Sequence, residues 1–469
     1  MSRVVVVGAG VGGLAAAIRC AEAGHDVTVL EATGVPGGKA GRLEAGGFVF
    51  DTGPSLVTMP DVLLGLVGDA VELLPVEPVT RYRFADGTSV ALSASPDASR
   101  AALEAWSPGA GDAWARFLRI CAAMWSASWP LLSGEPPWPP RRTAPGEPPP
   151  DPRALLAVRP WHTLASLARA VTPDRRLQMV IERFATYAGA DPRRAPAALA
   201  LAGYVEHAFG AWHPRGGVYA IVEALVARAA ALGVELAFDT SAVGLRTGGG
   251  RSVVAVDTGA GPVAAEHVVW AGDAEALDRL LGRARRPRER SLSGYVLLLG
   301  LRSPASVHHE IAFPRDYGTE FDDVFVARRP VRDPTLYVST SSVTDPGEAP
   351  DGGANAFVLV NAPSGLAPPA FAGYDEHVVS RLTARGFDVS DVAVRATRTP
   401  HDLERESGAV GGAIYGVAPH GRLGTLRRPG PRVRGVPNLL RAGGTSHPGG
   451  GLPLVALGGE LAARIIGPA

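Results

Sequence analysis

The beginning of the chain alternates short apolar runs with glycines, a pattern that predicts two parallel strands joined by a helix. Residues 3–7 are an arginine followed by four valines, which is typical of a strand buried on both faces. The alanine-rich residues 14–22 predict a helix that ends near Gly24, and residues 26–30 predict a second strand. The chain is therefore predicted to open with a βαβ unit.

The turn between the first strand and the helix satisfies the pattern G-x-G-x-x-G. Gly8 permits a tight turn, Gly10 lets the backbone approach a pyrophosphate, and Gly13 lets helix and strand pack closely. Gly12 lies in the same turn, where free N–H groups and the positive end of the helix dipole attract phosphate. Glu31 follows Gly13 by 18 residues and would accept hydrogen bonds from ribose hydroxyls. These residues predict a dinucleotide site.

A second glycine pair follows the second strand, in the sequence Gly-Gly-Lys-Ala-Gly-Arg. Gly38 lies there beside two cationic side chains, Lys39 and Arg42. Small residues with two cations suit a second approach to the pyrophosphate, which a deeply embedded FAD needs more than a loosely held NAD. We therefore expect FAD as the cofactor.

Later parts of the chain return to the same character. Apolar positions at helical spacing predict a helix over residues 220–232, followed by a strand at 234–238, a hairpin turning at 248–250 and a strand at 266–270. Residues 438–444 predict a further strand, and residues 454–466 predict a closing helix. Strands predicted at 295–301, 335–340 and 356–360 are assigned to a second sheet.

These elements predict an α/β protein with a Rossmann-like FAD-binding domain and a second domain of mixed sheet and helices. The length of 469 residues allows two cores. We expect residues 1–75, 213–290 and 431–469 to form the FAD-binding domain. Residues 76–212 and 291–430 are expected to form the substrate domain, and the first of these ranges is expected to face a membrane.

Charge and cysteine content exclude several classes of function. The chain carries 46 basic and 46 acidic side chains, so its net charge gives no reason to expect a nucleic-acid partner. Cys20 and Cys121 fit a reducing cytoplasm and offer neither a disulfide framework nor a metal site. No apolar stretch approaches the roughly 18 residues of a spanning helix, and the N-terminus lacks the pattern of a signal peptide. We expect a cytoplasmic protein.

Tryptophans are concentrated in one window of the sequence. Five of the eight lie between residues 106 and 138: Trp106, Trp114, Trp125, Trp129 and Trp138. Several recur at helical spacing, and such a face either packs on the core or inserts at a membrane surface, where tryptophan favours the interface. Residues 130–152 carry so many prolines that no regular structure is expected there.

Several segments together are similar to the bacterial phytoene desaturase family, the FAD-dependent carotenoid dehydrogenases within the flavin amine-oxidase-like superfamily. The matching segments are residues 50–60, 214–243, 399–404, 411–416 and 441–453, of which the last is the most specific. Residues 76–210 match poorly. The glycine-rich patterns are closer to the 1-hydroxycarotenoid 3,4-desaturase-like members than to the multi-step phytoene enzymes.

The resemblance implies further contacts with FAD. Three are expected beneath the flavin (Gly53, Pro54 and Ser55) and one on the adenine side (Val243). Three more are expected in the closing segment (Gly443, Gly444 and Pro453). Asp51 is expected to cap or order the loop beneath the flavin, and Glu404 to be a solvated helix residue.

The chemistry implied is the loss of a hydride and a proton from adjacent carbons of a C40 or C30 polyene, with oxygen or a quinone reoxidising the flavin. Because the positive charge is delocalised along the polyene, alignment and exclusion of water matter more than a strong base. Gly450 would let the polyene lie against the flavin. His447 would either tune the flavin or hold its turn structurally. We expect the substrate to be taken from the inner face of the membrane by a peripherally bound enzyme.

Other functions fit the same pattern. They are a flavin-dependent carotenoid isomerase, a carotenoid ketolase, an amine oxidase-like oxidoreductase and, outside enzymes, a prenyl-lipid carrier. The intact glycine pattern argues against the carrier, because a carrier needs no dinucleotide site.

Overall fold

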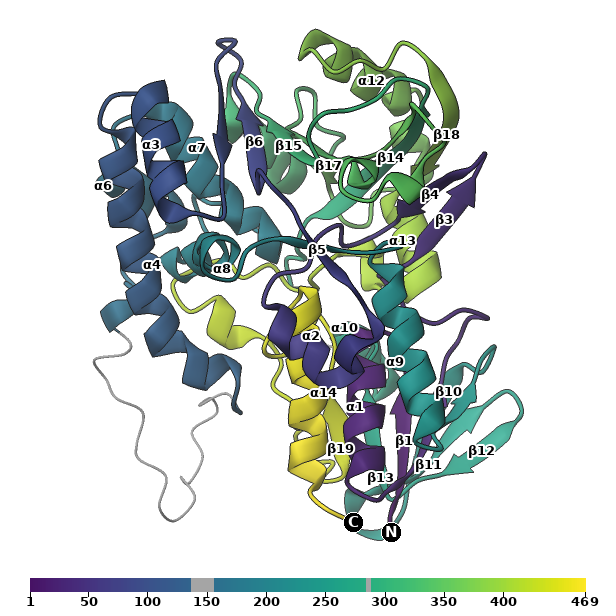
Figure 1. The fold of residues 1–469 in the computed structure, drawn as a ribbon. Coiled ribbons are helices and arrows are strands. Elements are labelled where there is room, and N and C mark those ends of the chain that lie inside the picture. Colours follow the sequence, from purple (N-terminus) through teal and green to yellow (C-terminus); the bar gives the residue numbers. More distant parts are fainter. Residues whose placement is uncertain (136–155, 284–287) are drawn as a thin grey trace.

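The computed structural model describes residues 1–135, 156–283 and 288–469 (Figure 1). A parallel sheet lies at the lower end of the molecule in this view, with both termini beside it. A mixed sheet and a group of helices lie at the upper end.

The first sheet has five parallel strands in the order β19-β13-β1-β2-β9. Its strands are β1 (Arg3–Val7), β2 (Asp26–Leu30), β9 (Glu235–Ala237), β13 (His267–Trp270) and β19 (Leu439–Arg441). One face is covered by α1 (Val11–Glu22), α2 (Pro60–Val67), α9 (Tyr219–Ala231) and α14 (Leu452–Ile466). The other face packs against β10 (Ala242–Thr247), β11 (Val253–Thr258), β12 (Gly261–Ala264) and α10 (Ala274–Leu280).

The valine run of β1 explains the layered arrangement. Val4 and Val6 lie in the core beneath the helices, whereas Val5 and Val7 lie in the core on the opposite face. Successive side chains of a strand point to opposite faces, so a strand covered on both sides needs an unbroken apolar run. The predicted α/β fold with a Rossmann-like sheet is confirmed.

The second sheet has seven strands in the order β18-β14-β17-β16-β15-β6-β7, and only the β6–β15 pair among them is parallel. Its strands are β6 (Thr80–Arg83), β7 (Ser89–Leu92), β14 (Ser293–Leu301), β15 (His309–Ala312), β16 (Leu336–Ser339), β17 (Ala354–Ala362) and β18 (Val392–Arg398). The three strands predicted for a second sheet correspond to β14, β16 and β17. The mixed second sheet is therefore confirmed.

Helices complete the upper part of the molecule. A group beside β6 and β7 consists of α3 (Pro96–Trp106), α4 (Ala110–Leu132), α6 (Leu164–Val171), α7 (Arg175–Glu182) and α8 (Leu201–Phe209). The remaining helices are α11 (Tyr317–Phe321), α12 (Tyr374–Ala384) and α13 (Pro400–Ser407). Two short ladders, β3 (Arg42–Ala45) with β4 (Phe48–Asp51) and β5 (Leu73–Pro75) with β8 (Trp212–Pro214), lie where the two parts of the molecule meet.

The tryptophan-rich window contributes to the core of this helical group. Trp114 is completely buried in α4 with Phe117 and Cys121, so Trp114 cannot insert into a membrane. Pro130 lies inside α4, which ends two residues later at Leu132, so the expectation of irregular structure is wrong for residues 130–132. Residues 136–155, which include Trp138, lie outside the described part of the chain. None of the helices in the described ranges is long and apolar enough to span a bilayer.

Candidate cofactor and substrate cavity

A cavity of about 970 Å³ lies between the two parts of the molecule. At one side its wall is built from the turn after β1, the ends of β2 and β13 and the loop after β19. At the other side the wall comes from the helical group and the seven-stranded sheet. One continuous space therefore joins the predicted dinucleotide site to the second domain.

The glycine turn after β1 shapes the first wall. Gly8, Gly10 and Gly12 line the cavity, and Gly8 has φ of +103°, a conformation that favours glycine. A Cβ at Gly10 would have one neighbour within 4 Å, the carbonyl oxygen of Gly37 at 3.9 Å, so a larger side chain there would project into the cavity. Gly13 has a different task, because a Cβ there would overlap the carbonyl oxygen of Gly8. The residues of the fingerprint thus form an open cradle at the N-terminus of α1.

Glu31 lies at the end of β2 beside this cradle. Its Oε2 accepts a hydrogen bond from the amide of Ala9 at 2.8 Å, and its Oε1 accepts bonds from the amide and hydroxyl of Thr33, each at 2.9 Å. Glu31 also lines the cavity. The carboxylate is therefore held in a fixed position at the edge of the cradle.

The second glycine pair lies directly against the first turn. The amide of Gly37 donates to the carbonyl of Ala9 at 2.9 Å, and Gly38 and Lys39 line the cavity next to it. The two glycine-rich segments therefore face the same space, as a cofactor gripped from two sides requires.

Lys39 points across the cavity to the second part of the molecule. Its Nζ donates to the carbonyls of Ala413 and Ile414 at 3.2 and 2.5 Å. Burial lowers the pKa of Lys39 to about 8, although the nearby charge of Asp273 acts in the opposite direction. Lys39 thus supplies a cation at the boundary between the two parts of the molecule.

Two predicted cofactor contacts lie elsewhere. Arg42 is on β3, outside the cavity lining, where it forms ion pairs with Glu44 and Glu223 at 3.1 and 3.2 Å and lies over the ring of Tyr219. Val243 is 59% exposed and also outside the lining, whereas residues 240–242 just before it are part of the lining. Arg42 and Val243 therefore lie outside the cavity lining, although Val243 directly follows residues that belong to it.

The loop after β4 forms the floor of the cavity. Gly53, Pro54 and Ser55 all line it, and Ser55 hydrogen-bonds to the hydroxyl of Tyr337 on β16. A Cβ at Gly53 would overlap the carbonyl oxygen of Lys39, so only glycine permits this close passage of the two loops. The loop is therefore fixed between both sheets.

Asp51 orders this loop from below. Its carboxylate accepts hydrogen bonds from the amides of Val218 and Tyr219 at 2.8 and 3.3 Å, at the start of α9. Burial raises the pKa of Asp51 to about 7. The structure thus gives Asp51 the ordering role expected from the sequence.

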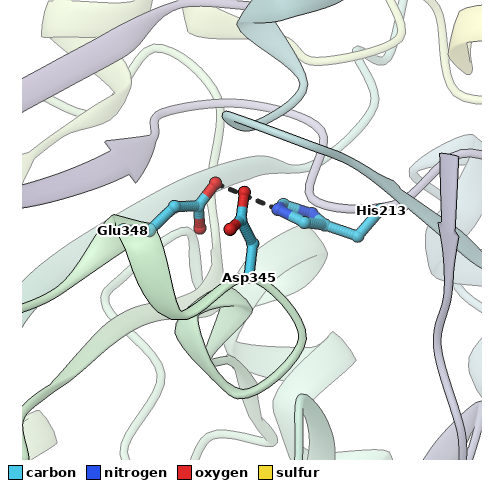
Figure 2. Close-up of side chains that lie close together, drawn as sticks. All are labelled: His213, Asp345 and Glu348. Carbon is cyan, nitrogen blue, oxygen red and sulfur yellow. Dashed lines mark hydrogen bonds and ion pairs between the residues drawn. The ribbon is translucent and has the colours of Figure 1, made fainter. Parts of the chain in front are cut away.

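A buried cluster of His213, Asp345 and Glu348 supports the same region (Figure 2). One potential metal-ligating atom from each side chain lies within 4.8 Å of the others. Glu348 accepts a hydrogen bond from Nε2 of His213 at 3.0 Å and another from the hydroxyl of Ser341, and Asp345 accepts one from the amide of Gly216 at 2.7 Å. His213 and Glu348 are therefore directly hydrogen-bonded, and Asp345 is held beside them by the amide of Gly216.

The loop after β19 closes the cavity. The predicted residues in it that line the cavity are Gly443, Gly444, His447, Gly450 and Pro453. His447 donates from Nε2 to the carbonyl of Gly134 at 3.0 Å, and burial lowers the pKa of its ring. A neutral His447 thus connects the closing loop to the segment after α4. Of the two roles considered for His447, this geometry favours the structural one.

Two residues near the cavity make contacts that the sequence does not predict. Arg428 lines the cavity and donates to the carbonyl of Gly444 at 2.8 Å, and burial lowers the pKa of Arg428 to about 10. Glu404 was expected to be solvated, but its Oε1 accepts a hydrogen bond from the amide of Gly411 at 2.8 Å. Arg428 and Gly444 lie in different loops, so the sequence carries no local signal for their contact.

The second side of the cavity is largely apolar and aromatic. Trp125 of α4 lines it and stacks on Trp129, so part of the tryptophan-rich face points into the cavity. Further apolar lining comes from both the helical group and the seven-stranded sheet: Phe184, Leu199, Val296, Phe357, Leu359 and Ile414. Such a wall suits a long hydrocarbon beside the dinucleotide site.

Comparison with known proteins identifies the family of this chain. Residues 11–466 match the family described as flavin containing amine oxidoreductase. The chain belongs to this family. Hydroxyneurosporene desaturase of Cereibacter sphaeroides is 34% identical over 99% of this chain and 97% of its own length, so the chain is a member of the carotenoid desaturase branch.

Two further comparisons concern another relative and a solved structure of the same fold. The 4,4'-diapolycopene oxygenase of a Methylomonas species is 30% identical over 98% of this chain and 97% of its own length. Cyclohexylamine oxidase from Brevibacterium oxydans superposes with a TM-score of 0.65 at 17% identity, over 99% of this chain and 98% of that one. The last comparison establishes a shared fold only.

Proposed function

We propose that this protein binds FAD and desaturates a carotenoid, removing a hydride and a proton from adjacent carbons of a C40 or C30 polyene. The observation that carries the proposal is the single cavity in which a glycine cradle meets an apolar, aromatic wall. A water-soluble amine would not need such a wall, and a lipid carrier would not need such a cradle. The full-length similarity to hydroxyneurosporene desaturase supports the same assignment.

The chain's own residues provide for the cofactor. Gly10 leaves room for a pyrophosphate at the N-terminus of α1, Gly12 lets the closing loop and α14 pack closely against this turn, and Glu31 lies where it can accept bonds from a ribose. Lys39 adds positive charge from the second glycine segment. FAD held in this way supplies the hydride acceptor for the reaction.

The substrate side of the cavity performs two tasks. Its apolar wall excludes water. The close packing of the closing loop fixes how near to the flavin a polyene can lie. A delocalised positive charge on the polyene removes the need for a strong base at the carbon that loses its proton. Alignment is therefore the main catalytic contribution of the protein. Oxygen or a quinone would reoxidise the flavin.

The substrate would enter from a membrane surface. Leu423 and Leu426 are 51% and 37% exposed, belong to the cavity lining and lie beside the cationic Arg422 and Arg427. Exposed apolar side chains among cations suit the headgroup region of an anionic bilayer. This segment replaces Trp114 as the proposed membrane contact.

Pigment analysis tests the proposed reaction. The protein would be expressed in cells that accumulate phytoene, neurosporene, lycopene or a 1-hydroxylated derivative, and the products resolved by absorbance and mass. A product with two hydrogens fewer than its substrate supports desaturation. A product with added oxygen would favour a ketolase, which the similarity to the diapolycopene oxygenase makes the second candidate. An isomer of unchanged mass would favour an isomerase.

A further inference from the structure

A buried charged cluster lies in the substrate part of the cavity, where the remaining wall is largely apolar. It consists of Arg183, Tyr187 and Glu206, and all three side chains belong to the cavity lining. Arg183 is 3% exposed and Glu206 is 5% exposed. The cluster lies between the helical group and the seven-stranded sheet, because Tyr82 of β6 is also bonded to Arg183.

The hydrogen bonds hold this cluster in one geometry. Nη1 and Nη2 of Arg183 donate to the hydroxyl oxygen of Tyr187 at 2.7 and 2.6 Å, and Nε donates to the hydroxyl oxygen of Tyr82 at 3.1 Å. Nη2 also approaches Oε1 of Glu206 at 3.4 Å, and the hydroxyl of Tyr187 donates to the same oxygen. Both bonds to Glu206 therefore use Oε1.

The second oxygen of Glu206 is left for another partner. Within residues 1–135, 156–283 and 288–469, no side chain or amide donates to Oε2 of Glu206. A carboxylate oxygen in an apolar surrounding loses the hydrogen bonds of water, and that loss is compensated only by a new donor. Since Glu206 lines the cavity, a bound molecule can supply this donor.

A hydrocarbon substrate would gain nothing from such a cluster. Buried ion pairs give little net stability compared with apolar side chains of similar size, so a cavity for a pure hydrocarbon is better built without them. An alcohol differs, because its O–H donates to a carboxylate. The cluster therefore fits a molecule that is mostly hydrocarbon and carries a hydroxyl group.

We propose that Glu206, oriented by Arg183 and Tyr187, accepts a hydrogen bond from the hydroxyl group of a hydroxylated carotenoid and thereby selects it over the parent hydrocarbon. This inference rests on the proposed function. Glu206 is a specificity residue that binds substrate away from the reacting carbons. The polyene of the bound molecule then extends along the apolar wall toward the closing loop at residues 443–453.

Two substrates test the inference on the unaltered enzyme. Neurosporene and its hydroxylated derivative would be supplied in the same detergent micelles, and flavin reduction and product formation would be measured for each. We expect kcat/KM to be about 10- to 100-fold higher for the hydroxylated compound, the range of a hydrogen bond to a charged group. Equal values would overturn the inference but not the proposed desaturase function. Failure of both compounds to reduce the flavin would contradict both.

A variant of Glu206 tests whether this residue causes the preference for the hydroxylated compound. Glu206→Leu is expected to raise KM for the hydroxylated compound about 10-fold or more relative to its effect on KM for neurosporene. The control is Glu182→Gln, because Glu182 is also buried and paired, with Arg175 at 2.8 Å, but lies outside the cavity lining. An equal loss for both substrates in Glu206→Leu would overturn the inference.

A second readout remains if Glu206→Leu does not fold. Tyr187→Phe keeps the ring but removes the hydroxyl that orients Glu206, and quenching of tryptophan fluorescence reports polyene binding directly, because Trp125 lines the cavity. We expect Tyr187→Phe to weaken quenching by the hydroxylated compound only. Equal weakening for both compounds would contradict the assignment.

Discussion

Gly450 lies against the ring of Tyr415, so that a Cβ at position 450 would be 2.7 Å from Cε1 of Tyr415. Both residues line the cavity, Gly450 from the closing loop and Tyr415 from a segment after α13. This contact fixes how far the loop extends toward the space where cofactor and substrate would meet. It gives the closing glycines a specific task, which is close packing.

Gly450→Leu is expected to abolish turnover while FAD remains bound. The added side chain cannot enter the space of Tyr415 and must displace either the ring or the loop, which moves the polyene away from the flavin. Single-turnover flavin reduction measures this effect, and bound flavin is quantified by absorbance. Gly259→Ala is a suitable control, because a Cβ at Gly259 meets nothing within 4 Å. Normal flavin reduction in Gly450→Leu would disprove this account of the loop.

Gly10→Val is expected to yield folded protein without flavin. The branched side chain would project into the cradle at the start of α1, where Gly10 has no close neighbour other than the carbonyl of Gly37. The ratio of flavin absorbance to protein absorbance in the purified variant is the measurement, and circular dichroism verifies folding. Unchanged flavin content in a folded Gly10→Val protein would refute the predicted pyrophosphate site.

His447→Ala is expected to lower the rate by less than the 10²–10⁴ typical of losing a general acid or base. The ring donates to the carbonyl of Gly134, so its removal costs about 1 kcal/mol of stability through one lost hydrogen bond. His447→Gln keeps an N–H donor and serves as the comparison. A loss greater than about 10⁴ in single-turnover flavin reduction would make His447 a chemical participant.

The buried network around His213 is expected to make stability depend on pH. Burial lowers the pKa of His213, but the hydrogen bond to Glu348 and the charges of Glu348, Asp51 and Asp345 outweigh that effect, so the pKa is raised above 6.5. A raised histidine pKa stabilises the folded state below the unfolded value and loses this contribution as pH rises through the folded value. His308, whose own pKa is lowered by burial and by His213, does not compete for the proton.

Urea unfolding at two pH values measures this contribution. The free energy of unfolding lost in His213→Gln, relative to the unaltered protein, should be larger at pH 6 than at pH 8.5. A loss that is the same at both pH values would show that the network does not bind a proton on folding.

Liposome flotation tests the proposed membrane contact. The double variant Leu423→Ser and Leu426→Ser should be recovered with anionic liposomes less than the unaltered protein, because it removes two exposed apolar side chains at the cavity lining. Val243→Ser is the matched control, since Val243 is also an exposed apolar side chain but lies on β10, outside that lining. Equal recovery of all three proteins would exclude Leu423 and Leu426 as the contact.

The sequence by itself determined the parallel sheet and its cradle. The strand of valines, the glycines of the fingerprint and Glu31 all lie within 31 residues, and Ala9 and Glu31 meet because one βαβ unit brings them together. Such short-range patterns can be recognised in the sequence because buried strands require apolar runs and tight turns require glycine. The predicted strands β14, β16 and β17 were found for the same reason.

Only the tertiary structure decided what surrounds the substrate. Arg183 meets Tyr82, which is 101 positions away, and His447 meets Gly134, which is 313 positions away. Arg42 is a predicted cofactor contact, but in the structure its side chain forms ion pairs with Glu44 and Glu223. The local sequence around a polar side chain does not indicate which distant residue it will contact. That partner depends on which segments the fold brings together and buries, because a buried polar group must be hydrogen-bonded.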